Sequence, residues 1–250
     1  MCVVALAWKA HPEWPLVLIG NRDEFHARPA AALAAWSDGS GILAGRDEQS
    51  GGTWLGVTEQ GRLAVITNRR NPNGPDPDKL SRGAIVTNTL VKGIDVLNAD
   101  QALTENYNGF SLLTVDQGQA WLVANQPEAR KTDLTAGIYG LANADLDEPW
   151  PKTVRIKDQL NSWLSGESHE PETLLDGLRS NDSPQVPPEK AENSPIFIHN
   201  AVYGTRCSTI VMVNAQGHGQ IVERRYDSEG SATGQTRLRF SWSSPELHLK

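Results

Sequence analysis

Apolar residues gather in short runs of strand length, separated by polar turns. Cys2–Trp8 and Leu16–Arg22 are two such runs, and the proline-containing segment 10–14 between them predicts an antiparallel hairpin. Further strands are predicted at Gly41–Gly45, Thr53–Thr58, Arg62–Asn68, Phe110–Asp116, Gln119–Ala124, Thr209–Val213, Gly219–Tyr226 and Arg237–Trp242.

Helices are predicted in two regions between these strands. Ser81 is a suitable N-cap for a helix over Arg82–Lys92, and Pro151 stands where a helix ending near Leu164 would begin. Shorter helices are predicted at 98–107 and Pro171–Leu178. The proline-containing segments 71–77 and 180–200 are predicted loops, the second suited to a lid. The order of elements predicts an α+β protein, with two packed sheets and helices outside or another α+β layering.

Composition narrows the class of protein. The 250 residues are 38% hydrophobic and 21% charged, which fits one domain over residues 1–250. A net charge of −7 argues against a nucleic-acid partner, which would need a basic face. No apolar run reaches the length of a membrane span, and the N-terminus lacks the basic segment of a secretory signal. We therefore expect a soluble, cytoplasmic protein without integral membrane association.

Cys2 is the most informative single residue. Removal of Met1 would leave a first residue that carries both a thiol and a free α-amine. Their ordinary pKa values, about 8.5 and about 7.7–8.0, are close enough for the amine to act as base toward its own side chain. The alternative is a small, buried cysteine at the start of a strand.

Four polar residues end the second strand of the hairpin. If Trp8 pairs with Leu16, then Cys2 lies opposite Arg22. A slip of one or two residues would place Asn21, Asp23 or Glu24 there instead. A guanidinium beside the sulfur favours the thiolate, and a carboxylate can hold the protonated amine. The alternative is a charged strand end that faces solvent.

Acyl transfer also needs hydrogen-bond donors for the oxyanion. Asn68 and Asn143 each stand where an apolar stretch ends, so both are candidates, with turn asparagines as the alternative. Arg206 precedes a strand and could bind a substrate carboxylate, or be an ordinary strand-end charge.

Other chemistry has little support in the sequence. The six histidines and two cysteines show no zinc spacing, and no glycine-rich phosphate loop is present. We therefore predict neither a metal site nor a cofactor. The eight tryptophans are explained better by packing than by an aromatic ligand pocket.

Several motifs together resemble the NRDE family, also called the transport and Golgi organisation protein 2 family. They are MCVVALAW (1–8), GNRDEF (20–25) with ARP (27–29), GGTWLGV (51–57), ITNRR (66–70), SRG (81–83), YGLAN (139–143) with LDEPWPK (146–152), and YGTR (203–206). The resemblance implies the four-layer αββα sandwich of N-terminal nucleophile hydrolases. Animal members of the family are linked to haem and lipid handling.

A more distant similarity is to choloylglycine hydrolases and penicillin V acylases, which cleave amides with an N-terminal cysteine. It implies that Asn68 and Asn143 serve the oxyanion and that Arg206 matches their late arginine. Those enzymes have Arg-x-x-Asp after the glycine of the second strand, whereas here Asn21 takes the arginine position and Glu24 the aspartate position. Which of residues 21–24 contacts Cys2 therefore stays open.

These observations predict an N-terminal cysteine hydrolase acting on a linear carbon–nitrogen amide bond of a small acylated substrate. Cys2, Arg22, Asp23, Asn68 and Asn143 are its expected catalytic residues. Asn21, Glu24 and Arg206 are expected to bind the substrate. The alternative is a non-catalytic carrier of haem or an acyl lipid on the same fold.

Overall fold

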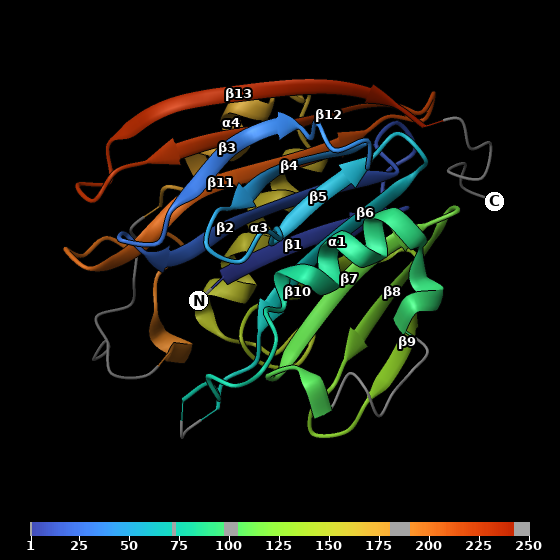
Figure 1. Ribbon diagram of the computed structural model, residues 1–250. Coiled ribbons are helices and arrows are strands. Elements are labelled where there is room, and N and C mark those ends of the chain that lie inside the picture. The colour runs from blue at the N-terminus through green and yellow to red at the C-terminus, as the bar shows by residue number, and fades with distance from the viewer. Residues whose placement is uncertain (1, 72–73, 98–104, 181–190, 243–250) are drawn as a thin grey trace.

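Two antiparallel sheets dominate the computed structural model, which describes residues 2–71, 74–97, 105–180 and 191–242 (Figure 1). The six strands of the first sheet are, in spatial order, β10 (Gly137–Leu141), β1 (Cys2–Trp8), β2 (Leu16–Phe25), β11 (Tyr203–Val213), β12 (His218–Tyr226) and β13 (Ala232–Ser241). The seven strands of the second are β3 (Ala30–Ala35), β4 (Ile42–Asp47), β5 (Leu55–Thr58), β6 (Arg62–Asn68), β7 (Phe110–Asp116), β8 (Gln119–Ala124) and β9 (Arg130–Leu134).

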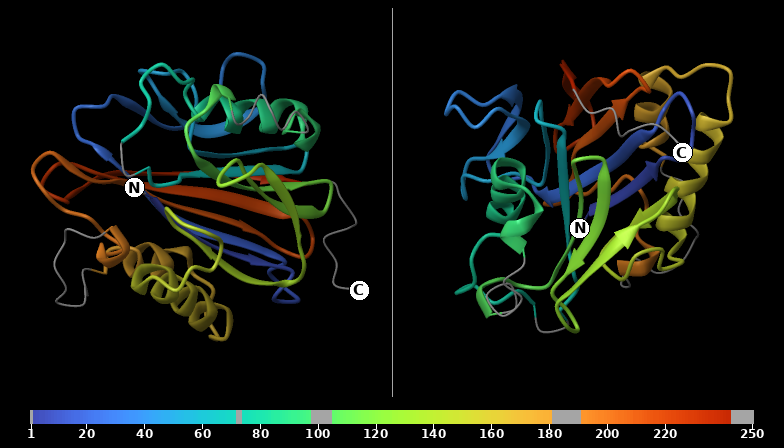
Figure 2. Two further views of the ribbon diagram at one scale, coloured as in Figure 1. Left: turned by 90° about the horizontal axis from the view of Figure 1, so that it is seen from below. Right: turned by 90° about the vertical axis from the view of Figure 1, so that its right-hand side faces the viewer.

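Helices cover the outer face of each sheet. Apolar residues of α3 (Pro151–Leu164) and α4 (Pro171–Gly177) pack on the first sheet. Those of α1 (Gly83–Lys92) and the 3₁₀ helix η1 (Ile94–Leu97) pack on the second, and a short 3₁₀ helix, η2, spans Ala191–Asn193. Figure 2 (left) shows the four layers edge-on. The predicted αββα sandwich is thus confirmed.

Strand β1 shows how the sequence produces these layers. All seven of its residues are buried, because both faces of the strand are covered. Side chains alternate along a strand, so Leu6 packs between the two sheets while Ala5 packs toward the helices. A continuous apolar run is what a strand in such a position requires.

The predicted hairpin register is confirmed: Trp8 pairs with Leu16, and Cys2 pairs with Arg22. Strands β3, β9 and β10 were not predicted. The first is an alanine-rich, mostly exposed edge strand and the second a mostly polar one, so neither has the apolar alternation that predicts a strand. Strand β2 continues three residues past its predicted end at Arg22, and β11 begins at Tyr203 rather than Thr209.

Helix α1 begins at Gly83, and the predicted N-cap at Ser81 is wrong. Arg82 occupies the N-cap position without a side-chain cap bond. The Ser81 and Arg82 carbonyls instead accept from the amides of Ala84 and Ile85. Most of the predicted helix 98–107, and residues 181–190 of the predicted lid loop, lie outside the described residues. None of the helices described here has the length and apolar character needed to cross a bilayer.

Candidate active site

A cavity of about 450 Å³ contains Cys2, and residues of both sheets line it. Most of the predicted site residues lie on its wall: Cys2, Arg22, Asp23, Glu24, Asn68 and Arg206. Cys2 is 8% exposed at the start of β1. Burial raises the pKa of its thiol, while the backbone amide of Asp23 and the Arg22 guanidinium act in the opposite direction. The expected thiolate stabilisation by Arg22 is therefore present, but burial outweighs it.

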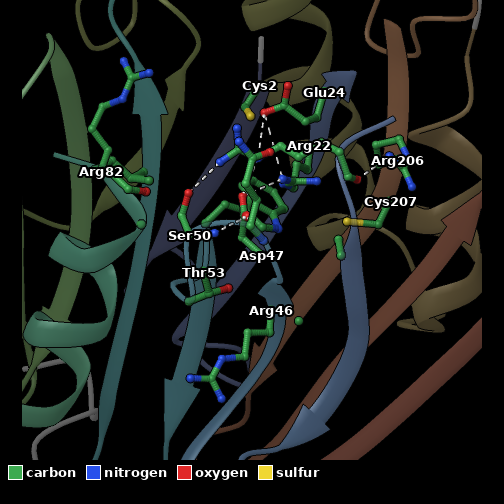
Figure 3. A pocket seen from close by; sticks show the side chains of 18 of the residues that line it. Cys2, Arg22, Glu24, Arg46, Asp47, Ser50, Thr53, Arg82, Arg206 and Cys207 are labelled. Atoms are coloured by element: carbon green, nitrogen blue, oxygen red, sulfur yellow. Dashed lines mark hydrogen bonds and ion pairs between the residues drawn. The ribbon is translucent and has the colours of Figure 1, made fainter. Parts of the chain in front are cut away.

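Cysteine and arginine alternate across the sheet at this wall. Arg22 on β2 pairs with Cys2 on one side and with Cys207 on the other, and Cys207 pairs in turn with Arg225. Residues paired across a sheet share a face, so all four belong to the cavity side. Figure 3 labels three of them, Cys2, Arg22 and Cys207. Cys2 and Cys207 are separated by a whole strand, about 9–10 Å, which is beyond disulfide reach. Both are free and buried.

Asp47 binds two arginines of the cavity wall. Its Oδ2 accepts from Arg28 Nε at 2.6 Å and from Arg22 Nη2 at 3.4 Å. Its Oδ1 accepts from the amides of Gln49 and Ser50, both at 3.1 Å. One carboxylate at the end of β4 therefore shapes the following loop and holds two cations of the cavity wall. Arg22 and Asp47 are labelled in Figure 3.

Asp23 lies in a buried polar site behind Cys2. Its Oδ1 accepts a 2.7 Å hydrogen bond from the Thr205 hydroxyl, and its carbonyl accepts from the Tyr203 hydroxyl at 2.8 Å. Burial raises the pKa of the carboxyl from 3.8 to about 6, despite the positive charge of the amino-terminus, the Thr205 hydrogen bond and Lys152. Asp23 thus titrates close to neutral pH beside the cysteine.

Lys152, which the sequence argument missed, contacts Asn143 and is coupled to Asp23 by charge. It is 2% exposed in the first turn of α3, where Nζ donates to Ser194 Oγ at 2.9 Å and to Asn143 Oδ1 at 3.5 Å. Burial lowers the pKa of its ammonium, and the charges of Asp23 and Cys2 oppose that shift. A buried cation at a helix N-terminus is unfavourable by itself. The hydrogen bonds and negative charges around Lys152 therefore offset the cost of burying it here.

Asn143 holds the end of β6 in place. Its Nδ2 donates to the Asn68 carbonyl at 2.8 Å, and its own carbonyl accepts from the Arg70 amide. Asn68 lines the cavity, whereas Asn143 is one step behind it. The geometry makes Asn68 the candidate oxyanion donor and Asn143 its support.

A β-bulge aims Arg206 away from its strand. Thr205 pairs with Asp23 and Cys207 pairs with Arg22, so Arg206 is the extra residue. Its Nη1 donates to the carbonyls of Phe25, His26 and Arg28 at 2.9–3.1 Å. Arg206 therefore fixes the segment after β2 at the cavity wall.

Asn21, predicted to bind substrate, does not line the cavity. Its Nδ2 donates to the Leu178 and Ile196 carbonyls, and its Oδ1 accepts from Ser208 Oγ. It is one residue from Arg22 and so faces the helices. Glu24 does line the cavity, with Oε2 at 4.0 Å from Arg22 and 3.9 Å from Arg28.

The sequence argument also missed Arg28, Asp47 and Arg82 in the cavity wall. Arg28, Arg82 and Lys152 all belong to motifs that carried the family resemblance (ARP, SRG and LDEPWPK), which was the available signal. Within the described part of the chain, no three histidine, cysteine or carboxylate residues are grouped to hold a metal ion.

Comparison with known proteins identifies the family. The sequence model described as "Transport and Golgi organisation 2" matches residues 1–228. The chain belongs to this family. A Transport and Golgi organization 2 homolog from Mus musculus is 32% identical in an alignment 257 positions long, which covers 90% of this chain and 92% of that protein. The Homo sapiens homolog is 29% identical in an alignment 272 positions long, which covers 95% of this chain and 97% of that protein.

Solved structures show which fold this Transport and Golgi organisation 2 protein shares. One mutant of the conjugated bile acid hydrolase from Clostridium perfringens matches with a TM-score of 0.54 and 8% identity, over 95% of this chain and 92% of that one. Another variant gives a TM-score of 0.51 and 9% identity, over 98% of each chain. These similarities show an N-terminal nucleophile hydrolase-like fold.

Proposed function

We propose that the protein is an N-terminal cysteine hydrolase that cleaves a carbon–nitrogen amide bond of a small acylated substrate. The observation that carries the proposal is the position of Cys2. Cys2 is the first residue of the β1–β2 hairpin and pairs with Arg22. It lines a cavity that Asn68 also lines. The similarity in fold to a bile acid hydrolase supports this assignment.

The mechanism begins with removal of Met1, which frees the α-amine of Cys2. Because burial raises the pKa of the thiol, the proton stays on sulfur until attack, and the neutral amine takes it at that moment. The thiolate attacks the carbonyl carbon, and the Asn68 side-chain amide donates to the oxyanion. The α-ammonium then protonates the leaving nitrogen as the C–N bond breaks, which leaves a thioester on Cys2.

Hydrolysis completes the cycle. The α-amine takes a proton from water, hydroxide attacks the thioester carbonyl, and the carboxylic acid departs as the proton returns to sulfur. Asp23, whose pKa of about 6 leaves it mostly ionised at pH 7, accepts a hydrogen bond from the α-ammonium and orients it.

Turnover tests the proposal directly. Protein that begins at Cys2 should release amine and fatty acid from an N-acyl amide, whereas Cys2→Ser should lose at least about 10²-fold in kcat. Cys207→Ser is the matched control, because it also removes a thiol from the cavity wall and should retain turnover. Unchanged turnover in Cys2→Ser would refute the proposal.

A second candidate is a non-catalytic carrier of haem or an acyl lipid, which would not need the Cys2 thiolate that burial disfavours. In that case Cys2→Ala should retain ligand affinity. Haem added to the protein should also shift its Soret band. If added haem gives no Soret shift, the protein is not a haem carrier.

A further inference from the structure

The cavity around Cys2 is basic although the chain is acidic. Seven of its lining side chains are lysine or arginine and four are carboxylic acids, in a chain of net charge −7. Positive charge gathered in a concave site attracts anions and raises their local concentration. Four of the seven cations already have a carboxylate within 4.0 Å: Arg22, Arg28, Arg46 and Arg225.

Each of the four carboxylates that line the cavity already has hydrogen-bond or ion-pair partners. Asp47 pairs with Arg22 and Arg28, and Glu223 lies 3.6 Å from Arg225 while it accepts from the Leu33 amide. Asp23 accepts from Thr205 in its buried site.

The Glu24 carboxylate also has partners close to it in the sequence and across the cavity wall. Its Oε1 accepts from the Phe25 amide, and its Oε2 faces the same two arginines that Asp47 binds. None of the four carboxylates is within ion-pair distance of Arg82.

Arg82 is one of three cavity cations, with Lys79 and Arg206, that have no ion-pair partner among the described residues. It stands at the start of α1, on the opposite side of the view in Figure 3 from Cys207. Its Nη1 donates to the Gly109 carbonyl at 3.0 Å, which uses one of the five guanidinium donors. Burial lowers the pKa of Arg82, while the charges of Cys2 and Glu24 oppose that shift. A partly buried guanidinium with free donors is costly unless an anion pairs with it.

We propose that the acyl amide cleaved at Cys2 carries an anionic group, a carboxylate or a phosphate, and that Arg82 binds this group. The inference deepens the proposed function and rests on it for the bond that is cleaved. Arg206 does not take this role, because three backbone carbonyls hold its guanidinium against the segment after β2, whereas Arg82 makes one such bond. Lys79 does not take it either, because its ammonium donates to the Glu105 carbonyl in a solvent-exposed hydrogen bond. A planar guanidinium matches both anions through paired hydrogen bonds.

The test compares probes that differ in charge. N-octanoylglycine and its neutral amide N-octanoylglycinamide share one skeleton, and N-octanoyl-O-phosphoethanolamine supplies the phosphate. Dissociation constants are measured by calorimetry on Cys2→Ala protein, in which no cleavage occurs. A charge-assisted contact predicts that one anionic probe binds about tenfold tighter than the neutral amide. The tighter of the two anions identifies the group.

Variants of Arg82 connect the preference to one residue. Arg82→Gln should abolish the preference, and Arg82→Lys should retain part of it. Arg239→Gln removes the same charge from exposed strand β13 and should leave the preference intact. Equal affinity for all probes, no binding of any, or a preference that survives in folded Arg82→Gln would overturn the proposal.

Cleavage is measured separately on the protein that begins at Cys2. Arg82-dependent binding without amine release would leave the anion site in place and remove the hydrolase function. Amine release at equal kcat/KM from the charged and neutral probes would keep the hydrolase and remove the anion site.

Discussion

Asp23 makes the stability of the protein depend on pH in a way that one substitution can isolate. Its folded-state pKa is about 6, against 3.8 ordinarily. Between these values the folded protein holds a proton that the unfolded chain releases, so Asp23 lowers stability as the pH rises through this window. The difference of about 2 units corresponds to about 3 kcal/mol once both states are ionised.

The variant Asp23→Asn removes this titration, and its Oδ1 can still accept from Thr205. Urea unfolding followed by tryptophan fluorescence gives the free energy of unfolding at each pH. The variant should gain about 2–3 kcal/mol relative to wild type between pH 4 and pH 7.5. Asp133→Asn, on the exposed edge strand β9, is the control and should show no such gain. A difference between Asp23→Asn and wild type that stays constant with pH would refute the reasoning.

Three further predictions concern the same site. Cys2 should react with iodoacetamide faster than Cys207, because burial and Glu223 together raise the pKa of the Cys207 thiol, whereas at Cys2 the positive amino-terminus opposes the effect of burial; equal rates by peptide mapping would contradict this. Lys152→Met removes a cation that lowers the pKa of Asp23, so the pH midpoint of the Asp23-dependent stability change should move upward, and an unmoved midpoint would show no coupling. Asn68→Ala should lower kcat by about 10²–10³ with little change in KM, whereas a loss of stability with normal turnover would remove Asn68 from the site.

Local patterns predicted the hairpin around Cys2 well. The apolar runs and the short loop fix which residues can pair, so the position of Arg22 opposite Cys2 follows from the sequence. The polar run 21–24 did not reveal which way each side chain points. The observed register assigns Arg22 to the cavity and Asn21 to the helices, as strand alternation requires.

Contacts between distant segments were beyond sequence reasoning. Thr205 reaches Asp23 from 182 residues away, and the bulge that turns Arg206 is visible only once β11 is paired with β2. Nothing in the sequence distinguishes Lys152 from an ordinary charge near a helix start. Its burial beside Asn143 depends on how α3 packs on the sheet.

The central claim is that Cys2 acts as an N-terminal nucleophile, and the intact mass of the purified protein tests it most directly. We predict a mass lower than that of the full sequence by one methionine residue, with Cys2 as the first residue. A mass that retains Met1 would contradict the claim, because the α-amine of Cys2 would then be part of a peptide bond and could not act as the base.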